Sequence, residues 1–213
     1  VVVFALSFPK PNLNLLDRFL LMMQTQDIPV TICFNKCDDQ KEEEIQAIVS
    51  QYRSCGAEVL VTSTVNGTGM DHLRKVLEGK TTVMAGPSGV GKSSVMNLLF
   101  PEAQMKTGEI SRKIKRGRHT TRHTELFCIG NQTYIMDTPG FTSLRLPDVE
   151  KEDLRHYYPE FEEASNACRF LGCVHINEPD CGVKDALEKQ EIPSARYENY
   201  KQFYEELRQQ KKY

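Results

Sequence analysis

Residues 86–93 read Gly-Pro-Ser-Gly-Val-Gly-Lys-Ser, which matches the phosphate-binding pattern G-x-x-x-x-G-K-[ST]. In this pattern, glycines let backbone N–H groups turn toward phosphate oxygens, and the helix that follows directs its positive end at the same anion. We expect Lys92 to reach the β- and γ-phosphates and the Ser93 hydroxyl to bind Mg²⁺. An apolar segment precedes the motif and an amphipathic one follows it, which favours a nucleoside triphosphate site over a chance glycine-rich turn.

A second motif, Asn35-Lys36-Cys37-Asp38, directly follows another apolar segment and fits the N-K-x-D pattern of guanine-binding proteins. The Asp38 carboxylate can accept hydrogen bonds from two guanine N–H groups that adenine does not present, and an unpaired buried group rejects the wrong base. We expect Asn35 to tie this segment to the phosphate loop and the Lys36 stem to cover the base. Taken alone, these four residues also fit a solvated loop. Ser63, just past the next apolar segment, strengthens the interpretation, because its backbone could contact guanine O6.

A third motif, Asp137-Thr138-Pro139-Gly140, fits D-x-x-G and begins about 45 residues after the phosphate loop. The same residue types form ordinary turns, but the spacing favours Asp137 holding Mg²⁺ through water and the Gly140 N–H sensing the γ-phosphate. The guanine-binding motif precedes the phosphate loop, so the motifs are circularly permuted. The predicted nucleotide-binding residues are Asn35, Lys36, Asp38, Ser63, Gly86, Ser88, Gly89, Val90, Gly91, Lys92, Ser93, Ser94, Asp137 and Gly140.

Residues 106–123 form a basic run with seven Lys or Arg against one Glu. Such runs are usually solvated surface, but this one lies where a GTPase places its first switch and suits phosphate backbones such as RNA. Thr121 (or Thr120) is the candidate switch threonine and a second Mg²⁺ ligand. Phe141 follows D-x-x-G where many GTPases place a water-orienting Gln. Another group must therefore act, with His119 the nearest candidate, or hydrolysis stays slow until a partner helps. The predicted catalytic residues are Lys92, His119 and Thr121.

Cys168, Cys173, His175 and Cys181 form the pattern C-x4-C-x-H-x5-C. Three thiolates and one imidazole match a closed, tetrahedral Zn²⁺ site with a structural role, because no coordination position remains for water. The alternative, three unrelated cysteines and a surface histidine, is disfavoured by their density. The odd total of seven cysteines also argues for a reduced compartment rather than a disulfide framework, and we expect the cytoplasm.

The hydrophobic pattern of the 213-residue chain predicts an α/β fold. Short apolar runs alternate with amphipathic helical segments, which indicates a P-loop NTPase three-layer sandwich with a mostly parallel sheet. After about Pro147 the strand pattern ends, so we place a permuted GTPase domain at 1–147 and a small helical, zinc-binding domain at 148–213.

The net charge of −2 identifies no partner, and no apolar stretch is long enough to cross a membrane. Because the chain starts without Met, inside a strand pattern, we expect it to be a fragment. The predicted strands are 1–6, 29–34, 58–62, 81–85, 124–129 and 132–137, and the predicted helices are 12–24 (capped by Asn12 or Asn14), 42–53, 70–77 and 92–99.

These motifs, together with R-G-R-H-T-T at 116–121 and D-T-P-G-F at 137–141, resemble the bacterial ribosome small-subunit-dependent GTPase A family over essentially the whole chain. The resemblance implies a late assembly factor that uses GTP/GDP, Mg²⁺ and Zn²⁺ and binds the small (30S) ribosomal subunit and its 16S rRNA near the decoding region. The subunit would stimulate hydrolysis, which drives release. The resemblance also implicates His119 in hydrolysis and implies an N-terminal OB-fold domain that this sequence lacks. We further expect a monomer that does not bind membranes.

Two alternatives remain open at this point. The chain could be a GTP-dependent RNA- or ribosome-binding module with negligible turnover, which Phe141 favours. It could also be an ATP-using P-loop kinase, against which Asp38 argues.

Overall fold

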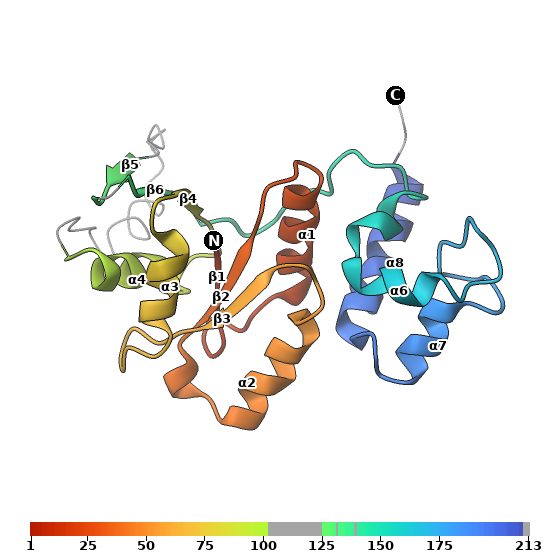
Figure 1. Ribbon diagram of the computed structural model, residues 1–213, viewed down its shortest axis with the longest axis horizontal. Helices are drawn as coiled ribbons and strands as arrows, with labels where there is room; N and C mark the ends of the chain where they lie inside the picture. The colour runs from red at the N-terminus through yellow and green to blue at the C-terminus, as the bar shows by residue number, and fades with distance from the viewer. Residues whose placement is uncertain (102–124, 131, 139, 211–213) are drawn as a thin grey trace. The chain divides into compact units, whose positions relative to one another are not determined.

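The computed structural model of the protein describes residues 1–101, 125–130, 132–138 and 140–210 (Figure 1). These residues form two compact units, and each is described by itself below. Unit 1 comprises residues 1–11, 31–45 and 59–142, and unit 2 comprises residues 12–30, 46–58 and 143–213. Helix α2 (Glu42–Val49) and strand β3 (Glu58–Val61) each span a boundary between these segments.

The first three strands form one sheet, in the order β1-β2-β3. β1 (Val2–Ala5) pairs in parallel with β2 (Thr31–Asn35), with Val3 opposite Cys33 and Ala5 opposite Asn35. All four residues of β1 and the last four of β2 are buried, as expected for parallel strands covered on both faces. The carboxyl end of β2 is therefore fixed inside unit 1, and the N-K-x-D motif begins on its last residue.

The second sheet has the order β4-β6-β5. β4 (Thr81–Met84) pairs in parallel with β6 (Tyr134–Asp137), and β6 pairs antiparallel with β5 (Glu125–Cys128). The hairpin predicted from the sequence is thereby confirmed. The two sheets join where Val3 N donates to Ala85 O (2.8 Å) and Ala85 N donates to Val1 O (2.9 Å). A further hydrogen bond runs from the Val1 amine to Val83 O (2.9 Å), so the predicted sheet is built from two three-stranded parts that meet along residues 1–3 and 83–85.

Two helices cover one face of these strands. α3 (Met70–Leu77) and α4 (Lys92–Leu99) have the bounds predicted from their apolar periodicity. Their buried side chains share one core with the strands, and this α/β packing confirms the predicted fold class. The core comprises Val3, Ala5, Cys33, Leu60, Met70, Leu73, Leu77, Met84, Val90, Val95, Met96, Leu99 and Ile135.

Unit 2 is helical. Helix α1 (Leu13–Gln24) is capped by Asn12, whose side-chain oxygen accepts from Leu15 N (3.0 Å), which selects one of the two predicted caps. The described residues after Ser143 contain no strand, as the sequence predicts. Their elements are the 3₁₀ turns Leu154–Tyr157 and Pro159–Phe161 and the helices α6 (Glu162–Ser165), α7 (Gly182–Glu188) and α8 (Ser194–Gln209); a further 3₁₀ turn, Ser50–Tyr52, belongs to the same unit.

The core of unit 2 joins α1 to the C-terminal helices. Leu21 belongs to the same buried cluster as Tyr158, Phe161, Tyr200 and Phe203. The predicted division at residue 147 stays a prediction, and compactness adds residues 12–30 and 46–58 to the C-terminal part. No helix within the described part of the chain is both long enough and apolar enough to span a bilayer.

Candidate nucleotide site and metal centre

The guanine-binding segment and the phosphate loop are tied together by side-chain hydrogen bonds. Asn35 Nδ2 donates to Val90 O (3.0 Å), which confirms the tie expected from the sequence. Lys36, in a left-handed conformation with φ 65°, donates its Nζ to Gly89 O (2.9 Å) and to Phe8 O (2.6 Å). A Cβ atom on Gly91 would lie 2.4 Å from Asn35 Nδ2, so this position accepts only glycine without displacing the tie.

Ser63 holds the carboxylate predicted to recognise guanine. Its hydroxyl, which is fully buried, donates to Asp38 Oδ1 and accepts from the N–H groups of Val65 (3.1 Å) and Asn66 (3.3 Å). Asp38 itself is exposed, so its carboxylate is oriented from one side and stays accessible on the other. The sequence assigned Ser63 a backbone role only. The sequence does not reveal this orienting hydroxyl, because nothing in the spacing of residues 38 and 63 indicates that they meet.

The phosphate loop has the backbone its glycines predict. Gly86, Gly89 and Gly91 have φ values of 142°, 82° and 99°, a region that other residues rarely adopt. Helix α4 begins at Lys92, directly after the loop, so its N-terminal N–H groups open onto it. The Lys92 ammonium is buried and donates to Gly86 O and Pro87 O, both at 2.7 Å, which places the charge inside the turn.

The D-x-x-G segment lies against this loop. Asp137 is the last residue of β6, next to β4, which leads into the phosphate loop. The Thr138 hydroxyl donates to Met84 O (2.9 Å). A Cβ atom on Gly140 would lie 2.8 Å from Ser88 N, so the close approach of these two backbones requires glycine at 140. The three predicted nucleotide motifs therefore gather at one end of the strands.

The remaining predicted residues lie either outside the described part of the chain or at the start of α4. His119, Thr121 and the basic run 106–123 lie outside the described residues. Ser93 is partly buried and Ser94 exposed, both in the first turn of α4.

The loop after β1 forms a wall of the site that the sequence does not predict. The Phe8 carbonyl accepts a hydrogen bond from Lys36, and the Ser7 hydroxyl donates to Asp39 Oδ2 (3.2 Å). A carbonyl acceptor leaves no signal in the sequence.

The four residues of the predicted zinc motif converge in unit 2. One ligand atom from each of Cys168, Cys173, His175 and Cys181 lies within 4.8 Å of the others. The Nδ1 atom of His175 is 3.6 Å from the Cys168 sulfur and 3.4 Å from the Cys181 sulfur, and the two sulfurs are 3.9 Å apart. Distances of this size surround a point from which each donor can reach one ion at Zn–S and Zn–N bond lengths.

A serine on α6 determines which nitrogen of His175 faces the cluster. The Ser165 hydroxyl donates to Phe161 O (2.7 Å), so its oxygen accepts from His175 Nε2 at 3.3 Å. That hydrogen bond places the ring proton on Nε2 and leaves the Nδ1 lone pair for the metal. The carbonyls of His175 and Val174 accept from the hydroxyls of Tyr197 and Tyr200, each at 2.6 Å, which fixes the loop from α8.

The electrostatics of this cluster call for a cation. Burial raises the pKa of the Cys173 thiol to about 12, and burial, assisted by Arg155, lowers the pKa of His175 to about 4. Neutral imidazole is the ligand form, but the buried thiols need a positive ion to ionise. Three sulfurs, one imidazole nitrogen and a hydrogen-bonded outer shell fit Zn²⁺.

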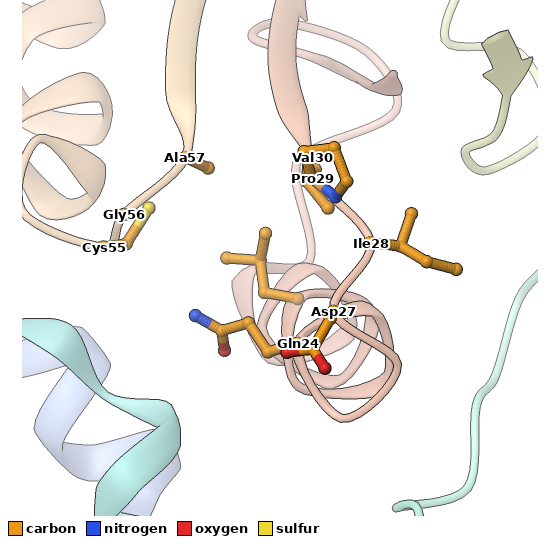
Figure 2. Close-up of a pocket in the computed structure, with 9 residues that line it drawn as sticks. Gln24, Asp27, Ile28, Pro29, Val30, Cys55, Gly56 and Ala57 are labelled. Carbon is orange, nitrogen blue, oxygen red and sulfur yellow. The ribbon is translucent and has the colours of Figure 1, made fainter. Parts of the chain in front are cut away.

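A pocket of about 260 Å³ in unit 2 is a different feature (Figure 2). It lies between the end of α1 and residues 55–57, and none of its lining side chains is cationic, so it is unsuited to a triphosphate. It is lined by Leu20, Gln24, Asp27, Ile28, Pro29, Val30, Cys55, Gly56 and Ala57.

The fold and the site together define the class: a P-loop protein of the GTPase type with circularly permuted motifs. The family model for the RsgA GTPase matches residues 1–147. The small ribosomal subunit biogenesis GTPase RsgA of Agathobacter rectalis is 57% identical over 216 residues, which span all of this chain and 70% of that protein. Its counterpart in Alkaliphilus metalliredigens is 46% identical over 213 residues, again with full coverage of this chain and 73% of the relative. The chain therefore belongs to the RsgA GTPase family.

Solved structures agree with this assignment. YjeQ from Thermotoga maritima superposes with a TM-score of 0.79 at 32% identity, over 99% of this chain and 71% of that one. YloQ, described as a circularly permuted GTPase, superposes with a TM-score of 0.75 at 34% identity, over 100% of this chain and 69% of its own. The permuted motif order inferred from the sequence is thus shared with a solved structure.

Proposed function

We propose that this chain is a GTP hydrolase that acts in maturation of the small ribosomal subunit. The observation that carries the proposal is the pair of hydrogen bonds from Asn35 and Lys36 to the phosphate loop, which hold a guanine-binding segment and a triphosphate-binding turn together. The relatives in Agathobacter rectalis and Alkaliphilus metalliredigens, which bear the name small ribosomal subunit biogenesis GTPase, support the biological role.

The roles of individual residues follow from the site. The Asp38 carboxylate, oriented by Ser63, accepts hydrogen bonds from the two guanine N–H groups, and the Lys36 stem covers one face of the base. Lys92 transfers its two hydrogen bonds from the carbonyls of the turn to phosphate oxygens. Backbone N–H groups of residues 88–94 surround the phosphates. Gly140 lies close to Ser88 of the same turn, and its N–H contacts the γ-phosphate.

Mg²⁺ completes the phosphate site. Ser93, Asp137 and Thr121 would hold it, directly or through water. When bound, Mg²⁺ neutralises charge that develops on the β- and γ-phosphate oxygens. Because Phe141 follows D-x-x-G, the chain itself offers no Gln there to orient water, and His119 takes that role. Hydrolysis then depends on the position of the segment that bears His119, which gives the ribosomal subunit a means to stimulate it.

The finer biological proposals rest on the same family. The basic run 106–123 contacts 16S rRNA, the protein acts as a monomer in the cytoplasm, and Zn²⁺ on the four-residue cluster maintains the C-terminal fold without taking part in hydrolysis. A second candidate function, a GTP-dependent ribosome-binding module with negligible turnover, is favoured by one observation, Phe141 in place of Gln.

One assay separates these functions. Multiple-turnover phosphate release is measured from GTP, with and without small ribosomal subunits. We expect slow release that the subunits accelerate, and no release under either condition would leave only the binding module. Asp38→Asn should shift preference from GTP toward XTP, whereas Asp39→Asn, the matched neighbouring carboxylate, should not. Equal behaviour of the two variants would contradict the guanine assignment.

A further inference from the structure

A chain of hydrogen bonds runs from the core of unit 1 to the phosphate loop. The Cys33 sulfur lies 3.1 Å from the Thr62 hydroxyl, and that hydroxyl donates to Asn35 Oδ1 (3.2 Å). Asn35 Nδ2 then donates to Val90 O (3.0 Å). Cys33, Thr62 and Asn35 are each fully buried, so solvent cannot replace a partner that is lost.

The direction of every bond in this chain follows from its fixed end. The Val90 carbonyl can only accept, so the Asn35 amide must present its NH₂ group there and its oxygen to Thr62. The single hydroxyl proton of Thr62 is donated in the hydrogen bond to Asn35 Oδ1. The Thr62 oxygen can therefore only accept a hydrogen bond from the Cys33 S–H. Burial raises the pKa of Cys33 to about 11, which keeps the thiol protonated and able to donate. The relay is therefore consistent in one direction only.

We propose that Thr62 is a positioning residue for guanine-nucleotide binding, which fixes the Asn35 amide through this relay and receives its own orientation from Cys33. The inference rests on the proposed function. With the Thr62 hydroxyl in place, a flip of the Asn35 amide would set the Asn35 side-chain oxygen against Val90 O. It would also turn the Thr62 hydroxyl proton from that oxygen to the Cys33 sulfur, which is a weak acceptor. The relay thus disfavours the flipped amide and keeps the guanine-binding segment in register with the phosphate loop.

The backbone of Thr62 adds to the same arrangement. Its N–H donates to Phe34 O (2.8 Å), the residue before Asn35, and its carbonyl accepts from Cys37 N (3.2 Å), the residue before Asp38. The Thr62 backbone therefore contacts the guanine-binding segment just before its motif and within it, and the Thr62 hydroxyl is the part that a substitution can remove without disturbing the main chain.

The test compares the release of fluorescent mant-GDP from the 213-residue chain and its variants. Thr62→Val replaces the hydroxyl with a methyl group of similar size and leaves Asn35 Oδ1 buried without its donor, and we expect about a tenfold faster dissociation. Thr62→Ser restores the hydroxyl and should stay within about twofold of wild type. Thr133→Val is the matched control: Thr133 is 5% exposed, and its hydroxyl oxygen accepts from Gly79 N (2.9 Å) just before β6, away from the phosphate loop.

Urea unfolding of each variant separates positioning from general destabilisation. The inference is supported if Thr62→Val releases mant-GDP faster than Thr133→Val at a comparable loss of stability, and Thr62→Ser restores the wild-type rate. Equal rates for wild type and Thr62→Val, or equal acceleration in the two valine variants, would overturn it while leaving the proposed function intact. A wild-type chain without affinity for mant-GDP would overturn the proposed function and the inference together.

Discussion

The buried arginine of unit 2, Arg196, provides the most direct test of how α1 is joined to the C-terminal helices. Arg196 on α8 is 2% exposed, and its guanidinium donates to Asp17 on α1 and to Glu160, each at 2.7 Å. It also lies 4.6 Å from the centre of the Tyr158 ring. Substituting Arg196→Met keeps much of the side-chain volume but removes the only side chain that the structure shows paired with both carboxylates.

The expected loss is large because both carboxylates are almost fully buried. Removing one member of a buried ion pair typically costs about 3–5 kcal/mol. Asp17 keeps a hydrogen bond from Asn199 (2.6 Å), which moderates the loss, so we expect about 4 kcal/mol for Arg196→Met. The matched control is Arg169→Met. Arg169 also pairs with an aspartate, Asp180 at 3.0 Å, but both side chains are about two-thirds exposed, and the loss should stay below about 1 kcal/mol.

Urea unfolding followed by far-UV circular dichroism and tyrosine fluorescence measures both variants, since the chain has no Trp. The pH dependence adds an internal check. Burial already raises the pKa of Asp17, and Arg196 opposes that rise, so the variant should raise it further. A carboxyl group with a raised folded-state pKa destabilises the fold while it is ionised and ceases to do so once it is protonated. The loss of unfolding free energy caused by Arg196→Met should therefore shrink as pH falls through the folded-state pKa of Asp17.

Two results would refute this reasoning. If Arg196→Met and Arg169→Met lose the same small free energy of unfolding, the carboxylates of Asp17 and Glu160 are not buried as described. If the deficit of Arg196→Met is the same at pH 7 and pH 4.5, uncompensated charge is not its cause.

Three further predictions follow from the same unit. A fragment of residues 148–213 with equimolar Zn²⁺ should show no cooperative unfolding by circular dichroism, because its core is completed by α1; a sharp transition would contradict this. Ser165→Ala should accelerate Zn²⁺ transfer to a chelator about tenfold, and long-range ¹H–¹⁵N NMR should show His175 of the wild type bound through Nδ1, with Nε2 coordination counting against it. The hydrogen bond from Arg18 lowers the pKa of Glu206, so the stability that Glu206 adds over Glu206→Gln should be present above about pH 4.5 and fade as pH falls through the lowered pKa; an unchanged difference at pH 3.5 would argue against the bond.

Contiguous motifs were readable from the sequence because their chemistry is local. The phosphate loop, N-K-x-D and D-x-x-G each place their functional groups within eight residues. The Cys and His spacing predicted a cluster that the structure brings together. Helices α3 and α4 have the predicted bounds, since amphipathic periodicity runs along each, Gly69 and Gly91 mark their starts, and Gly79 and Pro101 lie two residues past their ends.

Contacts between distant residues were decided by the tertiary structure. Asp38 and Ser63 are 25 residues apart, and Asp17 and Arg196 are 179 apart, so no spacing rule connects them. Periodicity shows that α1 buries one face but does not identify what that face meets, and chain order alone places α1 with the nucleotide-binding motifs. Only the packed structure shows that its buried aspartate needs the cation on α8, because the energetic demand of a buried charge is met by whichever partner the fold brings within reach.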